Sequence, residues 1–248
     1  MADLQRLPHA TLDIESRRPK AAKIYRLLGM NANRPLRVLE VGCGSGVISH
    51  LIAKWLGPES EVHAVDVVDQ RVVSDNFHFR KIEDVSLPYA DGMFDYVISN
   101  HVIEHVGDRQ SQSRHIGELR RALSSTGTGY LAVPSRWQLV EPHYRLPFLS
   151  WLPRKLRTPY LRLARRGSFY DCEPLTMPEV ESLLAAQGLS FENQCEAAIH
   201  SLADTEAGRN IPLKLATRLP RPMLHALRSI SPTHIYLFYK SSQQGRNV

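Results

Sequence analysis

The stretch VLEVGCGSGV, residues 38–47, is an apolar run that leads directly into three alternating glycines. The run predicts a buried strand, and the helical spacing of apolar residues over 46–57 predicts a helix immediately after it. Glycines at such a turn let the backbone approach a ligand closely, and the start of the helix offers unpaired N–H groups. The turn is therefore a candidate ligand site, and Glu40 places a carboxylate beside it.

The spacing of the glycines separates two classes of ligand. Gly42, Gly44 and Gly46 follow the pattern GxGxG, and Val47 stands where the dinucleotide fingerprint GxGxxG has its third glycine. This mismatch disfavours a nicotinamide-dependent oxidoreductase. Asp66 ends the apolar run VHAVD, and an acid at the tip of a second strand can accept hydrogen bonds from both hydroxyls of a ribose.

Strand and helix patterns alternate along most of the chain. This order implies an α/β fold with a parallel sheet and right-handed crossovers. The predicted strands are 36–42, 61–68, 77–82, one that begins within 94–106, 129–135, 189–199 and 233–240. The predicted helices are 16–30, 46–57, 114–125 and 176–188. Thr176 is the expected N-cap of the last helix, and Gly188 the residue that ends it.

We interpret the chain as a single domain with two insertions. The helix near its N-terminus is a candidate lid over the ligand or a candidate dimer contact. The segments are an N-terminal helical segment 1–34, a core 35–135, a basic aromatic insertion 136–175, a core segment 176–199, a helical insertion 200–232 and a last strand 233–240.

The composition is that of a globular domain. The 248 residues carry a formal net charge of +6, with 43% hydrophobic and 23% charged residues. No apolar run approaches 18 residues and the N-terminus lacks an apolar h-region, so we expect neither a spanning helix nor a secretory signal. The three cysteines lie far apart without a CxxC motif, so we expect no metal site and no disulfide, and a reducing cytoplasmic location fits.

Four motifs follow one another along the chain: VLEVGCGSG, VDVVD, IEDVSLPYADGMFD and VISNHVIEHV. In order and spacing they resemble those of class I S-adenosylmethionine-dependent methyltransferases, in the branch that acts on small molecules, lipids and glycans. The resemblance covers roughly residues 35–135, and the family's closing hairpin fits 189–199 with 233–240. It implies a Rossmann-like methyltransferase fold, with a mostly parallel seven-stranded sheet, an antiparallel last strand and helices on both faces. It also implies S-adenosyl-L-methionine as cofactor and S-adenosyl-L-homocysteine as product.

The resemblance also assigns cofactor contacts to residues of these motifs. It implies that Glu40 helps to hold the cationic amino group of the cofactor, which accounts for a carboxylate in an apolar run. It implies that Asp66 takes the ribose. It implies that Glu83 takes the adenine amino group, at a position where the family usually has Asp. The other implied cofactor-binding residues are Gly42, Cys43, Gly44, Gly46, Val67, Asp84 and Asn100.

Two histidines are candidate catalytic residues. His101 follows the fourth strand near the expected methyl-transfer point, and His143 follows the fifth strand; histidine titrates near neutral pH and suits a general base. Glu141, Tyr144 and Arg145 are candidate substrate-binding residues, because an acid and a tyrosine beside His143 can line an acceptor pocket. The alternative for this loop is a packed, hydrogen-bonded structure without contact to a substrate.

A basic segment bears on the acceptor. Residues 143–170 hold seven of the 31 basic residues and none of the 25 acidic ones, and the arginines alternate with apolar and aromatic residues. Four interpretations stay open: a solvated lid, a peripheral contact with an anionic membrane, a pocket for a phosphorylated or acidic acceptor such as a lipid-linked sugar, and a nucleic-acid surface. Prolines 147, 153 and 159 oppose a long amphipathic helix in this segment.

We therefore expect a methyltransferase that methylates an oxygen or nitrogen of a small-molecule, lipid or glycan acceptor. One alternative is a nucleic-acid (RNA) methyltransferase, which is disfavoured because no RRM, KH or helix-turn-helix pattern accompanies the basic segment. A second alternative is a protein that binds S-adenosylmethionine without catalysing methyl transfer. We expect a cytoplasmic protein. The basic segment suggests peripheral contact with a membrane as an alternative.

Overall fold

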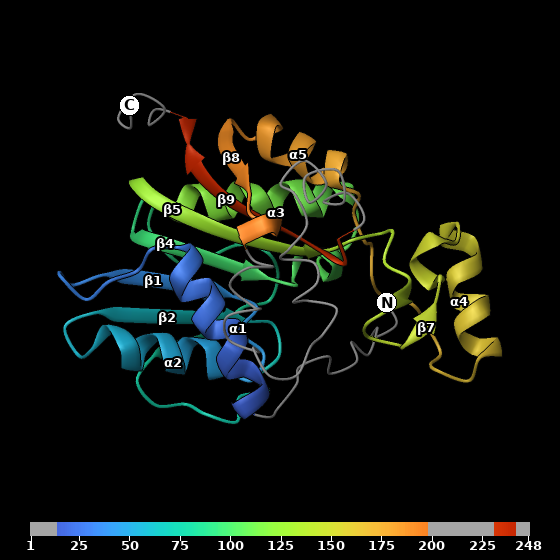
Figure 1. The fold of residues 1–248 in the computed structure, drawn as a ribbon, viewed down its shortest axis with the longest axis horizontal. Helices are drawn as coiled ribbons and strands as arrows, with labels where there is room; N and C mark the ends of the chain where they lie inside the picture. Colours follow the sequence, from blue (N-terminus) through green and yellow to red (C-terminus); the bar gives the residue numbers. More distant parts are fainter. Residues whose placement is uncertain (1–13, 198–230, 242–248) are drawn as a thin grey trace.

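The computed structural model describes residues 14–197 and 231–241. Its main sheet has seven strands in the order β3-β2-β1-β4-β5-β9-β8 (Figure 1). The strands are β1 (Arg37–Val41), β2 (Glu61–Asp66), β3 (His78–Lys81), β4 (Phe94–Asn100), β5 (Leu123–Pro134), β8 (Leu189–Asn193) and β9 (Thr233–Lys240). Strand β9 pairs antiparallel with both β5 and β8, and the pairs from β3 to β5 are parallel. The predicted sheet, with its antiparallel last strand, is confirmed.

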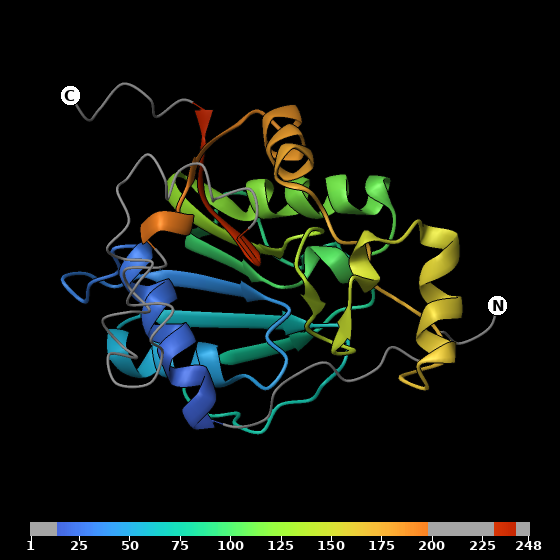
Figure 2. The same cartoon turned by 45° about the vertical axis from the view of Figure 1, so that its right-hand side comes forward.

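Helices cover both faces of the sheet (Figures 1 and 2). On one face lie α1 (Ile14–Leu27) and α2 (Val47–Leu56), whose apolar residues pack with Val38 of β1. On the other face lie α3 (Arg109–Ala122) and α5 (Met177–Ala186), which pack with Leu39. Because both faces are buried, the central strands are continuous apolar runs rather than alternating ones. Alternation along β1 places Glu40 on the α2 side with Val38.

Two predicted boundaries were wrong around α3. The helix begins at Arg109, five residues before the predicted start at 114, because Asp108 caps it by accepting a hydrogen bond of 2.9 Å from the Ser111 backbone N–H. Strand β5 begins at Leu123 instead of 129, so residues 123–125 are strand rather than helix. Glycine is unfavourable in strands and masks the strand pattern in the sequence. Gly129 is required here because a Cβ at this position would lie 2.0 Å from the Phe238 ring.

The predicted ends of α5 are confirmed. Thr176 and Glu179 form a capping box at its start, and Gly188 follows the helix with φ of 64°. The strand predicted over 189–199 is shorter, because its ladder with β9 ends at the pair Asn193–Tyr236. The predicted helical insertion at 200–232 falls outside the described residues apart from its last two positions.

The segment 136–175 leaves the sheet after β5 and returns beside its own starting point. Ser135 and Leu175 form an isolated bridge that closes the segment. Between them lie β6 (Val140–Glu141), β7 (Leu146–Pro147), the 3-10 turn η2 (Leu149–Trp151) and α4 (Arg154–Leu163). We name this segment the insertion; it lies off the carboxyl edge of the parallel strands (Figures 1 and 2). Its apolar cluster contains Tyr144, Leu146, Leu149, Leu161, Tyr170 and Cys172.

The prolines do not prevent helix formation in the insertion. Pro159 lies inside the ten-residue helix α4, and Pro153 is its N-cap residue. The prolines were expected to prevent a long amphipathic helix in this segment, and the helix that forms there has ten residues. Within the part of the chain that the structure describes, none of the helices is long and apolar enough to cross a bilayer.

Candidate functional site

A cavity of about 470 Å³ opens at the carboxyl edge of the parallel strands. The tips of β1, β2 and β4, helix α1, the loop after β3 and the insertion all contribute to its wall. This is where open α/β sheets bind ligands. Eleven of the residues predicted from the sequence line it: Glu40, Gly42, Cys43, Gly44, Asp66, Val67, Glu83, Asp84, Asn100, His101 and His143.

The glycine turn between β1 and α2 requires its glycines for backbone reasons. Gly42, Gly44 and Gly46 all have positive φ, at 75°, 51° and 75°. A Cβ on Gly42 would lie 2.3 Å from a methyl carbon of Val102. A Cβ on Gly46 would lie 2.8 Å from the carbonyl oxygen of Val73. Gly46 is not on the cavity wall, so its contribution is to the shape of the turn.

Asp66 at the tip of β2 is tied to this turn. Its carboxylate accepts hydrogen bonds from the backbone N–H of Gly44 at 2.8 Å and of Val68 at 3.2 Å. Asp66 also lines the cavity. The same carboxylate therefore fixes the turn and faces the ligand space.

Glu40 is a buried carboxylate on the wall of the cavity. It is 2% exposed and accepts a hydrogen bond of 2.5 Å from the Ser49 hydroxyl of α2. Burial raises the pKa of Glu40 to about 7, against the lowering effect of Ser49 and of Arg17. Arg17 and Lys20 of α1 line the same cavity, and burial lowers the pKa of Lys20 to about 8. The sequence analysis did not single out these two cations, because only packing of α1 brings them to the strand tips.

The loop after β3 brings Glu83 and Asp84 to the cavity. Asp84 accepts a hydrogen bond of 2.8 Å from the Ser86 backbone N–H. Farther along the loop, the Arg121 guanidinium donates to the carbonyl oxygens of Leu87 at 2.8 Å and Tyr89 at 2.7 Å. Helix α3 thus holds the loop in place, although Arg121 itself is not on the cavity wall.

The tip of β4 carries an unsatisfied polar atom. Asn100 is 9% exposed, and its Oδ1 has no hydrogen-bond partner among the described residues. A buried acceptor without a partner is rare, and because Asn100 lines the cavity, its Oδ1 is a candidate acceptor for a ligand donor. The next residue, His101, has φ of 58°, which turns the chain away from the sheet while its N–H donates to the Ala132 carbonyl at 2.9 Å.

Three histidines surround one buried carboxylate beyond β4. Glu104 has no exposed side-chain surface, and its Oε1 lies 3.7 Å from His101 Nδ1, 3.9 Å from His105 Nε2 and 3.9 Å from His143 Nε2. Burial alone would raise the pKa of Glu104, but its interactions with His101 and His143 lower it below its ordinary value. Burial lowers the pKa of His101. At His143 burial also favours a lower pKa, but the nearby Glu104 carboxylate favours a higher one, and the net shift in pKa is upward. His101, His105 and His143 line the cavity, whereas Glu104 lies behind them.

The comparison with known proteins agrees with this geometry. Residues 39–131 match the family model described as "Methyltransferase domain". Over 104 residues, 38% of this chain, the sequence is 30% identical to ajmaline N-methyltransferase of Rauvolfia serpentina. The chain spans about a third of the length of the curated relatives it matches.

Solved structures share the fold at low sequence identity. A putative methyltransferase in complex with the Haloferax volcanii Trm112 methyltransferase activator superposes with a TM-score of 0.54 at 17% identity, covering 93% of this chain and 99% of that one. PKMT2 from Rickettsia typhi, in complex with AdoHcy, gives a TM-score of 0.53 at 15% identity, covering 93% of this chain and 54% of that one. These likenesses establish the fold alone.

Residues 39–131 therefore form a domain of the S-adenosylmethionine-dependent methyltransferase type. The cofactor of this family is S-adenosylmethionine. The residues present suit it: buried Glu40 complements a cation, Asp66 and Glu83 offer acceptors at successive strand ends, and Asn100 offers an unpaired buried oxygen. The chemistry of these residues therefore fits this cofactor, and their contacts with it stay a prediction.

The predicted acceptor residues of this methyltransferase are off the cavity wall. Glu141 is 1% exposed and accepts a hydrogen bond of 2.7 Å from the Tyr144 backbone N–H. The Tyr144 hydroxyl donates to Asp171 Oδ1 at 2.8 Å, and Arg145 is exposed. The geometry is that of a packed loop, and a role for these three residues in acceptor binding stays a prediction. Asp171, which the sequence analysis did not select, lines the cavity in their place.

A buried histidine of α3 also reaches the cavity wall. His115 Nε2 lies 2.9 Å from the Ser99 hydroxyl oxygen, and burial lowers the pKa of His115 to about 4. It is therefore neutral at neutral pH. In the sequence it is one residue of an amphipathic helix, and nothing local distinguishes it from a core histidine.

Proposed function

We propose that this methyltransferase transfers the methyl group of S-adenosylmethionine to a nitrogen of a small amine, with an oxygen acceptor as the second candidate. The main support is that the acids at the strand tips and the histidines around Glu104 line one cavity. Asp171 lines the cavity on the side to which the insertion contributes, and the buried carboxylate of Glu104 lies behind the histidines there. Negative charge there favours approach of a protonated amine. The ajmaline N-methyltransferase relative supports the same choice of acceptor.

The residues at the strand tips position the two reactants. Glu40, Asp66, Glu83 and Asn100 hold the cofactor, which when bound supplies a methyl group already activated on a sulfonium. Holding the acceptor in line with that methyl group removes the entropic barrier of a bimolecular encounter, worth about 7–11 kcal/mol. Helix α1 contributes Arg17 and Lys20 to the cavity wall, and displacement of water by the bound reactants strengthens the charge interactions within the site.

A histidine removes the proton that the acceptor nitrogen loses. We assign this role to His101, because burial lowers its pKa and keeps it neutral at neutral pH, able to accept a proton. His143 is the alternative base, but its pKa is raised. Glu104 at 3.7 Å from His101 Nδ1 stabilises the imidazolium that forms. Such general-base catalysis contributes about 10²–10⁴-fold.

The insertion presents a surface suited to an anionic membrane. Among the described residues, eight of the eleven exposed large hydrophobic side chains lie in the insertion, and Leu163 is 82% exposed. Trp137 and Trp151 pack edge to face at 5.6 Å, and Phe148 packs against Trp151 at 5.2 Å. The basic residues exposed on the same segment are Arg145, Arg154, Lys155, Arg162, Arg165 and Arg166. Exposed aromatic and basic side chains together match the interface of an anionic bilayer, so we propose peripheral binding there.

A turnover screen with labelled cofactor tests the chemical proposal. The panel contains secondary and tertiary amines, hydroxylated small molecules, lipid-linked sugars and RNA, each with wild type and His101→Gln. We expect transfer to an amine, reduced about 100-fold or more in the variant, with unchanged affinity for S-adenosylhomocysteine. Transfer to RNA alone, or binding of cofactor without transfer to any acceptor, would contradict the proposal.

Vesicle sedimentation tests the membrane proposal. We expect binding to vesicles of phosphatidylcholine with phosphatidylglycerol, weakened by salt and absent for phosphatidylcholine alone. The double variant Leu156→Ser with Leu163→Ser loses binding, whereas Val72→Ser, an exposed hydrophobic outside the insertion, does not. Equal binding of all variants, or no binding to anionic vesicles, would refute a role for this surface.

A further inference from the structure

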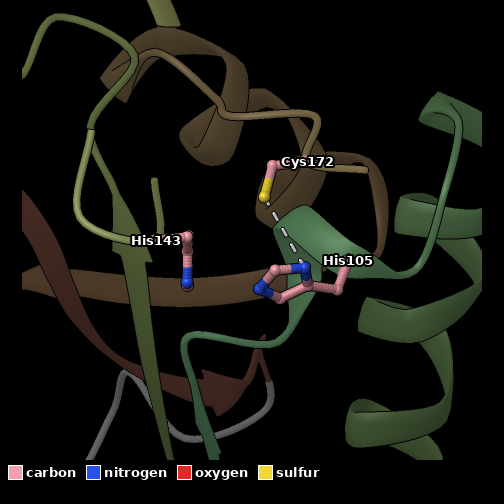
Figure 3. A group of neighbouring side chains, drawn as sticks. All are labelled: His105, His143 and Cys172. Carbon is pink, nitrogen blue, oxygen red and sulfur yellow. Dashed lines mark hydrogen bonds between the residues drawn. The ribbon is translucent and has the colours of Figure 1, made fainter. Parts of the chain in front are cut away.

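Three metal-ligating side chains from separate parts of the chain meet at the cavity. One ligand atom from each of His105, His143 and Cys172 lies within 4.8 Å of the other two. Figure 3 shows the three side chains converging from η1 (Ile103–His105), from the start of the insertion and from its end. His105 and His143 also line the cavity, and Cys172 is 2% exposed.

The distances suit a tetrahedral ion after small rotations of the side chains. His105 Nδ1 and Cys172 Sγ lie 3.7 Å apart. With bonds of about 2.0–2.1 Å to nitrogen and 2.3 Å to sulfur, two nitrogen ligands and one sulfur ligand of a tetrahedral zinc ion lie about 3.3–3.6 Å from one another. The His105–Cys172 pair is close to this spacing. The rings of His105 and His143 meet edge to face with centroids 4.8 Å apart.

Glu104 lies where such sites have a supporting carboxylate, at a distance that small side-chain rotations would close. Metal-binding histidines commonly direct their second ring nitrogen to a carboxylate, which fixes the orientation of the ring. His105 turns Nδ1 to Cys172 and Nε2 to Glu104, at 3.9 Å from its Oε1. Glu104 Oε1 is also 3.9 Å from His143 Nε2. One buried carboxylate thus serves two of the three ligands.

Charge balance points in the same direction. Glu104 is fully buried, and an isolated buried carboxylate is costly unless positive charge compensates it. A divalent ion bound to the thiolate of Cys172 and two neutral imidazoles adds one net positive charge. The thiol proton leaves to solvent when the metal–sulfur bond forms. The ion, its three ligands and Glu104 are then neutral together, and the Asp171 carboxylate, whose Oδ1 lies 3.4 Å from Cys172 Sγ, adds one negative charge beside them.

We propose that His105, His143 and Cys172 bind a zinc ion whose fourth position opens to the cavity. One thiolate with two imidazoles is a donor set that suits zinc, and three protein ligands with one open position are typical of catalytic sites. A hydroxyl oxygen of the acceptor suits the open position, because coordination of the attacking nitrogen itself would occupy the lone pair that takes the methyl group. This role rests on the proposed function, whereas metal binding itself does not. This proposal replaces the expectation of no metal site, and it leaves His101 as the proton acceptor.

Spectroscopic titration of the full chain with cobalt(II), followed by competition with zinc(II), tests the site. We expect one equivalent of cobalt, tetrahedral d–d bands and a thiolate-to-cobalt charge-transfer band that zinc abolishes. Cys172→Ser loses the charge-transfer band and weakens zinc binding about 100-fold or more, since loss of even an outer partner costs about 10–100-fold. Cys195→Ser, which removes a buried thiol elsewhere, keeps the spectrum of wild type.

A second variant keeps the test decisive if Cys172→Ser does not fold. His143→Gln weakens zinc binding to a similar degree, whereas His78→Gln, outside the cavity wall, does not. Calorimetry with S-adenosylhomocysteine shows whether each variant retains its folded cofactor site. Absence of a stoichiometric metal in wild type, or a spectrum that survives both ligand variants, would overturn the proposal. Lack of turnover with every acceptor would instead contradict the proposed function and leave the metal titration valid.

Discussion

The carboxylate of Asp66 accepts a hydrogen bond of 2.8 Å from the backbone N–H of Gly44, across the gap between β1 and β2. A second hydrogen bond, from the Val68 N–H at 3.2 Å, fixes the same carboxylate from its own strand end. The glycine turn and the candidate ribose site are therefore one unit. A change at Asp66 acts on the cofactor directly and through the turn.

Asp66→Ala is expected to weaken binding of S-adenosylhomocysteine by about 10- to 150-fold. The estimate corresponds to about 1.5–3 kcal/mol for loss of hydrogen bonds to a charged group. Asp66→Asn keeps an acceptor and loses less. Isothermal calorimetry measures the affinities, and Asp69→Ala is the control, because Asp69 pairs with Arg71 at 2.8 Å outside the cavity wall. Equal affinities for wild type and Asp66→Ala would exclude the ribose assignment.

Gly42→Ala is expected to destabilise the protein more than Gly29→Ala does. Both glycines have positive φ, so each substitution costs about 1–2 kcal/mol of unfolding free energy from the backbone. At Gly29 nothing lies within 4 Å of the new Cβ, whereas at Gly42 a Val102 methyl carbon lies 2.3 Å away and overpacking adds about 1–3 kcal/mol.

Urea unfolding of both variants and of the double variant Gly42→Ala with Val102→Ala measures this difference. The double variant should recover part of the overpacking cost and none of the backbone cost. If Gly42→Ala and Gly29→Ala lose the same stability, the close approach of Val102 to the turn does not shape this site.

The sequence motifs predict the strand tips well because each reports a local event. Asp66 and Asn100 end their strands and Glu40 is one residue from the end of β1, and parallel strands bring their carboxyl ends to one edge. Glycine spacing likewise predicts the turn, since positive φ is a local requirement. These parts of the site need no knowledge of tertiary packing.

Other parts of the site depend on contacts between distant segments. Arg17 reaches the cavity only because α1 packs against α2, and Cys172 and Asp171 reach it only because the insertion folds back on its start. Nothing in the residues around them marks these positions. Glu141 shows the converse case: a polar cluster in the sequence indicated a pocket, but its members satisfy each other within the insertion.

Arg121→Ala is expected to loosen the loop that carries Glu83 and Asp84. Arg121 donates to two carbonyl oxygens of that loop, and its partner Glu118 accepts a hydrogen bond of 2.7 Å from the Leu87 N–H. We expect faster amide hydrogen exchange over residues 82–92 with little change in β1 and β4, and about tenfold weaker binding of S-adenosylhomocysteine, as for loss of about 1.4 kcal/mol. Arg120→Ala, an exposed neighbour on α3, is the control. Faster exchange throughout the sheet would indicate a general loss of stability instead.

The pKa of Glu40 predicts a pH dependence of both stability and cofactor affinity. Its folded pKa of about 7 lies above its ordinary value of 4.5, so between these pH values the folded state binds more protons than the unfolded state. Stability of the free protein therefore falls as pH rises from about 4.5 to 7, by up to about 3 kcal/mol from this group alone. His115 acts oppositely: its folded pKa of about 4 lies below 6.5, so its contribution rises with pH between those values.

Comparison with Glu40→Gln separates the contribution of Glu40 to the pH dependence from that of His115. The difference in unfolding free energy between wild type and this variant should decrease steadily from pH 4.5 to 7, because only wild type titrates at position 40. S-adenosylhomocysteine carries a cationic amino group that favours ionised Glu40, so wild-type affinity should rise with pH up to about 7 and then level off, while the variant stays weak throughout. Glu59→Gln, an exposed acid away from the cavity, should follow wild type. An affinity that is independent of pH between 5 and 7 in wild type would show that Glu40 does not meet the cofactor's charge.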